Sequence, residues 1–416
     1  MDRILLKNGR IATVKSKGPK FGGEMADLGV IERGYVVIEN GIILDVGGGD
    51  GADFIDDKTE VIDLEGRLVL PGFVDSHTHL VHYGSRENEL KLKLEGASYL
   101  DILKQGGGIL STVRATRSAS YDELYKKALK SLDLMLLWGT TTVEAKSGYG
   151  LNFEDEVKCL RVAKGIEHPI DIVSTYLGAH AVPEEYKENV DGYIDLMIEK
   201  VMPYVKKEKL AEYVDAFCEE GFFNLEQTRR VLRAAKELGF QVKLHADEIE
   251  PMGGAQLAAE LGAVSVEHLV AVSEEGIDAM KEAGVIPVLL PGTSFYLRLK
   301  KYAPAREMIR RGLAVAIASD YNPGTCPTES LQSVMIFASL GMGLTPQEVI
   351  SAVTINAAYA IGRGSEIGSI EKGKKADIVI MNAPNENYVI YHFGINHIDM
   401  VIKNGKIVVR DGKLVY

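Results

Sequence analysis

Short runs of alternating apolar and polar residues occupy both ends of the chain. Residues 4–14, 35–49 and 59–72 combine strand-like stretches with Asn-Gly or Glu-Gly pairs, which is typical of β-hairpins. Residues 375–384 and 397–416 repeat this pattern with Asn-Gly and Asp-Gly turns. The two ends are therefore expected to pair in space as one small β-sandwich domain.

The middle of the chain changes to apolar strands separated by longer helical segments, such as residues 121–139 and 224–239. This order is typical of a parallel sheet covered by helices. The expected strands are residues 73–79, 140–150, 171–180, 213–221, 240–248, 263–270, 285–292 and 314–324. Eight such units predict an α/β fold, a (β/α)8 TIM barrel over residues 70–362. Residues 1–69 and 363–416 are expected to form the two parts of the small domain.

Composition excludes several classes of partner. Of the 416 residues, 46% are hydrophobic and 25% are charged, which is ordinary for a globular protein with room for two domains. The net charge of -12 argues against a nucleic-acid partner, and the sequence has no basic stripe that would reverse this. No apolar run is long enough for a membrane span and the first residues lack a signal-peptide pattern, so a cytoplasmic location is expected.

The stretch PGFVDSHTHL, residues 71–80, has the pattern of a buried strand that ends in two histidines. Because strand side chains alternate faces, His77 and His79 are expected to point the same way. Two such histidines can also be satisfied polar groups at a sheet edge. His245 and Asp320 end two further predicted strands, however, and barrel active sites lie at this end of the strands. These four residues are therefore expected to hold one divalent metal, zinc first, with iron or manganese as alternatives.

A metal site of this kind predicts hydrolysis. It keeps one position open for water, whose pKa can fall from about 15.7 toward about 7. One metal is favoured over two, because the fourth predicted strand has no lysine to carry a bridging carboxylate. Glu219 as a bridge to a second ion is an alternative, and Lys146 is a candidate substrate or structural cation. His268 fits three roles: a ligand, a hydrogen-bond partner of the water, or a packed side chain.

Several motifs resemble those of the metal-dependent amidohydrolase superfamily. They are PGFVDSHTH (71–79), HADE (245–248), EHL (267–269), SDYNPG (319–324) and GSIEKGKKADIVI (368–380). Longer segments narrow the resemblance to the imidazolonepropionase family: residues 85–117, 146–151, 177–187, 218–223, 245–255 and 322–330. The resemblance implies a homodimer that hydrolyses the cyclic amide of 4-imidazolone-5-propanoate to N-formimidoyl-L-glutamate in histidine degradation.

Three residues are expected to carry the proton transfers. Glu248 follows His245 by three residues, on the loop or first helical turn after the fifth strand, and is assigned the acid/base role. The alternative for Glu248 is a solvated carboxylate at a helix start. His268 is expected to orient the attacking water, and Asp320 is expected to share the proton.

The substrate is a small anion, and Arg86 is the expected cation for its propanoate group. A guanidinium binds a carboxylate through two parallel hydrogen bonds, although an ordinary ion pair with Glu87 or Glu89 would also explain Arg86. The resemblance implies that further residues contact the ligand, namely Tyr149, His180, Glu248, Asn322, Gly324 and Thr325.

Two other functions compete with this hydrolase. Another amidohydrolase, either a cyclic amidase or an aminohydrolase acting on a purine or pyrimidine, would share the metal ligands, but a neutral base has no carboxylate for Arg86 to bind. A non-catalytic scaffold would be expected to lack some of the ligands, and all four are present in the sequence.

Overall fold

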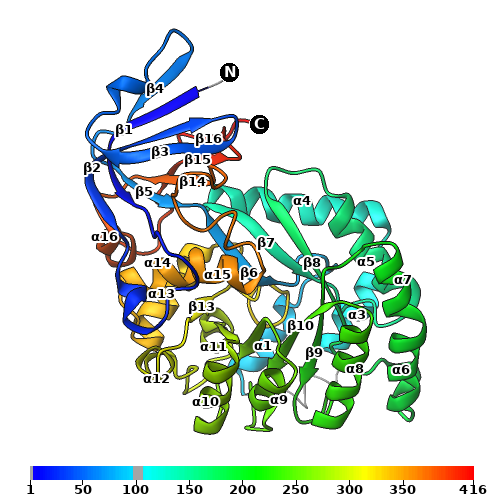
Figure 1. The fold of residues 1–416 in the computed structure, drawn as a ribbon. Coiled ribbons are helices and arrows are strands. Elements are labelled where there is room, and N and C mark those ends of the chain that lie inside the picture. The colour runs from blue at the N-terminus through cyan, green and yellow to red at the C-terminus, as the bar shows by residue number, and fades with distance from the viewer. Residues whose placement is uncertain (1–2, 97–105) are drawn as a thin grey trace.

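The computed structural model describes residues 3–96 and 106–416. Residues 97–105, part of the 85–117 segment, lie outside the described residues. Most of the chain forms a barrel of strands and helices, and both ends of the chain join a smaller β-domain beside it (Figure 1). The predicted α/β architecture is confirmed.

Eight parallel strands form the barrel, and neighbours in the sheet are consecutive in the chain. They are β6 (Phe73–Thr78), β7 (Thr140–Lys146), β8 (Asp171–Ala179), β9 (Tyr213–Cys218), β10 (Gln241–Ala246), β11 (Ser265–His268), β12 (Ile286–Leu289) and β13 (Ala316–Ile317). Backbone bonds join the last strand to the first: Asp320 donates to the carbonyl oxygen of His77 at 3.0 Å, and His79 donates to that of Tyr321 at 2.9 Å. The predicted barrel therefore nearly closes at the level of the paired histidines.

Most of the helices follow barrel strands and cover the outside of the barrel (Figure 1), and the last one follows a strand of the small domain. They are α1 (Glu87–Leu94), α3 (Ile109–Ser118), α4 (Tyr121–Leu137), α5 (Phe153–Gly165), α6 (Val190–Leu196), α7 (Met202–Lys207), α8 (Leu225–Glu237), α9 (Gly254–Glu260), α10 (Glu274–Ala283), α11 (Pro291–Tyr296), α12 (Ala305–Arg310), α13 (Leu331–Met342), α14 (Pro346–Val353), α15 (Ile355–Ala360) and α16 (Glu386–Tyr391). No helix of the described residues is both long and apolar enough to cross a membrane.

Local sequence explains the alternation of these elements. Every residue of β7 is buried, as expected for a strand with the barrel interior on one side and helices on the other. The following helices begin at polar caps. Ser120 starts α4 and exchanges hydrogen bonds with Glu123, and Asn224 starts α8 with the same reciprocal arrangement to Gln227.

The small domain is one nine-stranded sheet built from both ends of the chain. Its strands are β1 (Arg3–Ala12), β2 (Val30–Glu39), β3 (Ile42–Gly48), β4 (Thr59–Asp63), β5 (Leu68–Pro71), β14 (Ile378–Met381), β15 (Ile398–Lys403), β16 (Lys406–Arg410) and β17 (Lys413–Leu414). The antiparallel pair of β5 and β14 joins the two ends.

One core cluster unites the two halves of this sheet. It contains Ile4 and Ile38 from the N-terminal strands together with Ile378 and Ile402 from the C-terminal strands. The predicted pairing of the chain ends is thus confirmed. The boundaries at residues 69/70 and 362/363 stay a prediction.

Candidate active site and metal centre

The residues expected to hold a metal come together at the C-terminal end of the barrel. His77 belongs to β6 and His79 follows that strand directly. His245 belongs to β10, and Asp320 lies three residues beyond β13. All four side chains are buried. Three separate strands therefore deliver these groups to one place.

The two histidines of β6 face the same side of the strand. Thr78, between them, turns toward the neighbouring strand and donates from Oγ1 to the carbonyl oxygen of Glu144 at 2.6 Å. This alternation directs both imidazoles toward His245. One ring nitrogen from each of His77, His79 and His245 lies within 4.8 Å of the others.

Asp320 completes the group. Its Oδ1 lies 3.4 Å from Nε2 of both His77 and His79, while Oδ2 accepts a hydrogen bond of 2.6 Å from Oγ1 of Thr293. Nε2 of His77 and Nε2 of His245 are buried without a hydrogen-bond partner among the described residues. Buried polar atoms normally have partners. Unpartnered imidazole nitrogens beside a carboxylate fit a divalent metal.

Two carboxylates orient the imidazoles from behind. Nδ1 of His77 lies 2.7 Å from Oε2 of Glu267, and Nδ1 of His245 lies 2.9 Å from Oδ2 of Asp215. Such contacts fix which nitrogen of a metal-binding histidine faces the metal, and they raise its basicity. In both residues this leaves Nε2 for the metal.

A buried ionic cluster fills the barrel below this site. Nζ of Lys146 lies 3.0, 2.8 and 2.9 Å from oxygens of Glu144, Asp215 and Glu267, respectively. Lys243 lies 3.2 Å from Glu144 and 3.3 Å from Glu267. All five side chains are fully buried, so each charge depends on these partners. Lys146 is therefore a structural cation, and the alternative prediction that it binds substrate is wrong.

The spacing of ligand atoms does not support the alternative second ion at Glu219. Two further sets of described residues have ligand atoms as close together as the three histidines: His77, Glu144 and Glu267, and Asp215, His245 and Glu267. The carboxylates of these sets already pair with Lys146 or Lys243. Glu219 belongs to none of the sets found among the described residues.

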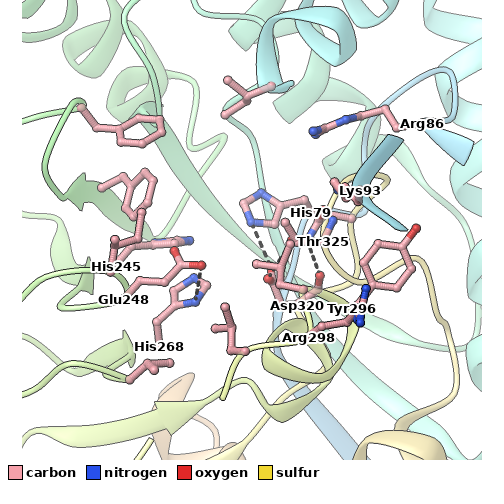
Figure 2. A pocket seen from close by; sticks show the side chains of 18 of the residues that line it. His79, Arg86, Lys93, His245, Glu248, His268, Tyr296, Arg298, Asp320 and Thr325 are labelled. Carbon is pink, nitrogen blue, oxygen red and sulfur yellow. Dashed lines mark hydrogen bonds and ion pairs between the residues drawn. The ribbon is translucent and has the colours of Figure 1, made fainter. Parts of the chain in front are cut away.

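Glu248 and His268 lie side by side at the edge of the metal site (Figure 2). Oε1 of Glu248 is 3.5 Å from Nδ1 of His268, and 14% of the Glu248 side chain is exposed. Burial, with the negative charges of Asp320 and Glu219, raises the pKa of Glu248 to about 8. Burial also holds the pKa of His268 well below its usual value. The Glu248 carboxyl, whose pKa lies near neutral pH, is thus beside a neutral imidazole.

Two of these residues have an uncommon backbone conformation. His268 has φ 72° and Asp320 has φ 55°. Residues other than glycine rarely adopt these left-handed values, which cost roughly 1–3 kcal/mol and cluster at functional sites. The folded chain therefore directs these two side chains into the site at a cost in stability.

In protein freed of metal, the free energy of unfolding should fall as the pH rises from about 5 to about 8. The pKa of Glu248 is about 8 in the folded chain against its usual 4.5. Folded protein consequently binds more protons than unfolded protein across this window, and stability is lost with rising pH. Denaturant titrations measure this, and the fall should be shallower in Glu248→Gln. Equal slopes for the two proteins would contradict the raised pKa.

A cavity of about 810 Å³ opens above the metal residues. It is lined by most of the residues expected to contact substrate, namely Arg86, Tyr149, His180, Glu248, Asn322 and Thr325, and by His79, His245, His268 and Asp320. Figure 2 shows Glu248 and His268 on one side, with Arg86, Lys93 and Tyr296 across the cavity. Glu248 and His268 therefore face the same space as the cationic side chains of Arg86 and Lys93.

Arg86 forms the ion pair with Glu89 that the sequence left open. Its Nε and Nη2 donate to the two carboxylate oxygens at 2.9 and 2.8 Å, and both side chains are only 9% exposed. The third nitrogen, Nη1, lies against Gly324, where a Cβ would come within 2.1 Å of it. Gly324 therefore packs against Arg86, which lines the cavity. A side chain at position 324 would displace the guanidinium.

His180 and Tyr149 form an aromatic wall beside the metal residues. The His180 ring stacks on His79 with centroids 4.9 Å apart and an interplanar angle of 13°. Nδ1 of His180 lies 2.9 Å from the carbonyl oxygen of Gly148, and burial holds the pKa of His180 well below its usual value. The ring of Tyr149 lies 5.2 Å from that of His180. A neutral imidazole with one nitrogen already bonded can present the other to a ligand.

Asn322 organises the loop after Asp320. Its Oδ1 accepts from the backbone N–H groups of Gly324 and Thr325 at 2.8 Å each. Its Nδ2 donates to the carbonyl oxygen of Asp320 at 2.6 Å and to Oγ1 of Thr325 at 2.7 Å. This side chain therefore holds the loop in shape at the cavity wall.

Sequence reasoning missed several residues of the site. Asp215, Lys243 and Glu267 contact the metal-facing histidines or neutralise their partners, and Thr293 bonds to Asp320. The available signal was a charged residue between two apolar neighbours in a strand, as in VKL of β10 and VDA of β9. Such residues are costly to bury unless they are paired.

Comparison with known proteins identifies the family of this chain. The family model described as "Amidohydrolase family" matches residues 68–408. A protein named imidazolonepropionase from Alkaliphilus oremlandii is 56% identical over 411 residues, covering 98% of this chain and 97% of its own. One of the same name from Treponema denticola is 53% identical over 416 residues, covering 99% of each chain.

Solved structures share the fold at lower identity. An adenosine deaminase from Xanthomonas campestris with bound zinc superimposes with a TM-score of 0.71 at 20% identity, covering 99% of this chain and 94% of its own. A 5-methylcytosine deaminase from Klebsiella pneumoniae gives a TM-score of 0.74 at 17% identity and 99% coverage of both chains. At this identity the likeness shows the fold alone.

Proposed function

This chain belongs to the amidohydrolase family and, within it, to the imidazolonepropionases, and from this premise we propose how its residues hydrolyse 4-imidazolone-5-propanoate. Water adds to the ring carbonyl carbon, and the bond from that carbon to the ring nitrogen breaks. The nitrogen takes up a proton, which gives N-formimidoyl-L-glutamate. The observation that carries the proposal is the identity of 53–56% over nearly the whole chain to imidazolonepropionases.

The three histidines and one aspartate at the base of the cavity are proposed to hold one divalent metal. The assigned ligands are His77, His79, His245 and Asp320. When bound, such a metal lowers the pKa of water and polarises a carbonyl oxygen. Zinc is the proposed metal, and iron accepts the same ligands. Metal analysis of purified protein decides between them.

Glu248 is proposed to move the proton. Its carboxylate faces the cavity beside His268, and its raised pKa suits it to take a proton from water and return it to the departing ring nitrogen. His268 is neutral at the same edge and is proposed to orient the attacking water. Asp320, whose Oδ2 is held by Thr293, is proposed to share the proton.

The opposite wall is proposed to bind the propanoate. Arg86 is fixed by Glu89, and this preorganises its guanidinium. The remaining assigned contacts to substrate or product are Tyr149, His180, Glu248, Asn322, Gly324 and Thr325. A cation on one wall and the proton-transfer pair on the other would orient the ring carbonyl toward the base of the cavity.

Replacing Arg86 by alanine should raise KM for 4-imidazolone-5-propanoate by about 10- to 100-fold, the value of a charged hydrogen bond of roughly 1.5–3 kcal/mol. An imidazolone without the propanoate should be affected much less. Arg86→Ala combined with Glu89→Ala removes both members of the ion pair, so that Glu89 is not left without its arginine. Lys91→Ala, at an exposed position of α1, is the control. Equal effects on both substrates would remove Arg86 from substrate binding.

The direct test of function is turnover of freshly made 4-imidazolone-5-propanoate by metal-analysed protein, with the product identified by mass. Turnover that chelation abolishes is expected. A parallel panel of adenosine, 5-methylcytosine and cyclic amides other than the imidazolone tests the competing reactions. Turnover of a panel member without turnover of the imidazolone would reject the proposed substrate while keeping the hydrolase family.

The homodimer is proposed from the family resemblance, and the cytoplasmic location stays a prediction from the sequence. The chain is proposed to act as a homodimer in the cytoplasm. Sedimentation of the purified protein measures its oligomeric state, and a monomer at working concentration would contradict the homodimer.

A further inference from the structure

Glu219 is a buried carboxylate at the end of β9 that binds the segment carrying Glu248. Its Oε2 accepts from the backbone N–H groups of Glu248 and Ile249 at 2.9 Å each. Its Oε1 accepts from those of Glu250 at 3.2 Å and Glu220 at 3.0 Å. The residue is 1% exposed. An ionised carboxylate has about four acceptor positions, and backbone N–H groups account for all of them.

The other end of the same segment is held in a similar way. Asp247, just before Glu248, accepts from the backbone N–H groups of Gly253, Gly254 and Ala255 at 3.1, 3.1 and 3.0 Å. Residues 247–253 form neither helix nor strand. Backbone hydrogen bonds of the segment include those from Met252 to Glu250 and from Ala271 to Asp247. The two carboxylates bind most of its remaining N–H groups and so help to fix its course.

A matching arrangement holds the loop that carries Tyr149. Glu156 of α5 is fully buried, and its carboxylate accepts from the backbone N–H groups of Gly148, Gly150 and Leu151 at 3.1, 2.7 and 2.9 Å. Two loops that bring assigned residues into the cavity are thus each bound by a buried carboxylate from a neighbouring element. The recurrence argues that these carboxylates are built to position loops.

We propose that Glu219 is a positioning residue that holds the backbone of residues 248–250 so that the Glu248 carboxylate faces His268 in the cavity. Glu219 acts through Glu248 and contacts neither metal nor substrate. The inference rests on the proposed function, because the acid/base role of Glu248 gives the positioning its catalytic effect. A carboxamide at position 219 offers one acceptor oxygen in place of two, and its NH₂ group meets N–H donors.

The test is a double-mutant cycle on the metal-loaded protein. Glu219→Gln should lower kcat by about 10- to 100-fold, the cost of misplacing a catalytic group by about 1 Å, with metal content unchanged and KM changed much less. In a Glu248→Gln background the same substitution should have little further effect on kcat, because the carboxylate that Glu219 positions is already absent. Glu220→Gln, at the exposed neighbouring position, is the matched control and should match the unmodified protein.

Hydrogen exchange provides a readout that needs no turnover. The amides of residues 248–250 should be protected in the unmodified protein and lose protection in Glu219→Gln, with the barrel strands unaffected. If Glu219→Gln fails to fold, Glu219→Asp, which keeps the charge on a shorter side chain, replaces it in the cycle.

Three results would overturn the inference: turnover of Glu219→Gln within twofold of Glu220→Gln, loss of metal in Glu219→Gln, or additive effects of the 219 and 248 substitutions. Failure of the proposed function would appear instead in the unmodified protein, as no turnover of the imidazolone.

Discussion

Replacement of His245 by alanine is expected to leave a folded barrel that no longer retains a divalent metal. His245 supplies one of the three clustered imidazoles, and Asp215 holds its Nδ1 so that Nε2 faces the others. Loss of a single electrostatic stabiliser costs about 10²- to 10³-fold in kcat, and the fall here should exceed that because activation of water is lost as well. Metal analysis and turnover after dialysis measure both effects.

The control for this variant is His392→Ala, at an exposed position in the small domain. It should keep full metal content and turnover. Circular dichroism and thermal melting establish that His245→Ala is folded. Unchanged metal content in folded His245→Ala would remove this residue from the proposed ligand set.

Glu248→Gln is expected to lower kcat by about 10²- to 10⁴-fold, the usual contribution of a positioned general acid or base. The amide keeps the size of the side chain but cannot accept and release the proton. Metal content should be unchanged, because Glu248 approaches His268 and is not one of the proposed ligands. Single-turnover kinetics separate this chemical step from binding.

A matched carboxylate on the same loop supplies the control for Glu248. Glu250 is exposed and its side chain is not among those lining the cavity, so Glu250→Gln should be close to the unmodified protein. Near-normal kcat for metal-loaded Glu248→Gln would contradict the proton-transfer role and direct attention to His268.

Much of the barrel and of the metal site could be predicted from the periodicity of apolar residues and from which residues end the predicted strands. Continuous apolar runs separated by amphipathic segments identified the barrel strands, because a strand buried on both faces has few polar residues. The spacing of His77 and His79 predicted a common direction, because strand side chains alternate. Both inferences depend on local geometry, which neighbouring residues determine.

Partnership between distant residues could not be read in the same way. The sequence allows Arg86 to pair either with substrate or with a nearby glutamate, and the structure pairs it with Glu89 at the cavity wall. The sequence is compatible with a substrate role and a structural role for Lys146, and its contacts to Asp215 and Glu267 place it below the metal site. Which of several possible partners a long side chain takes depends on the distances that folding creates.

The sequence by itself determined the class of fold, the pairing of the chain ends and the concentration of metal-binding residue types at the C-terminal ends of strands. These features follow from residue periodicity and from the direction of parallel strands. Only the tertiary structure decided which carboxylates stand behind His77 and His245, and that Glu219 binds the Glu248 loop. Those contacts join segments about 30 to 190 residues apart, and they form only when the closed barrel brings the ends of its strands together.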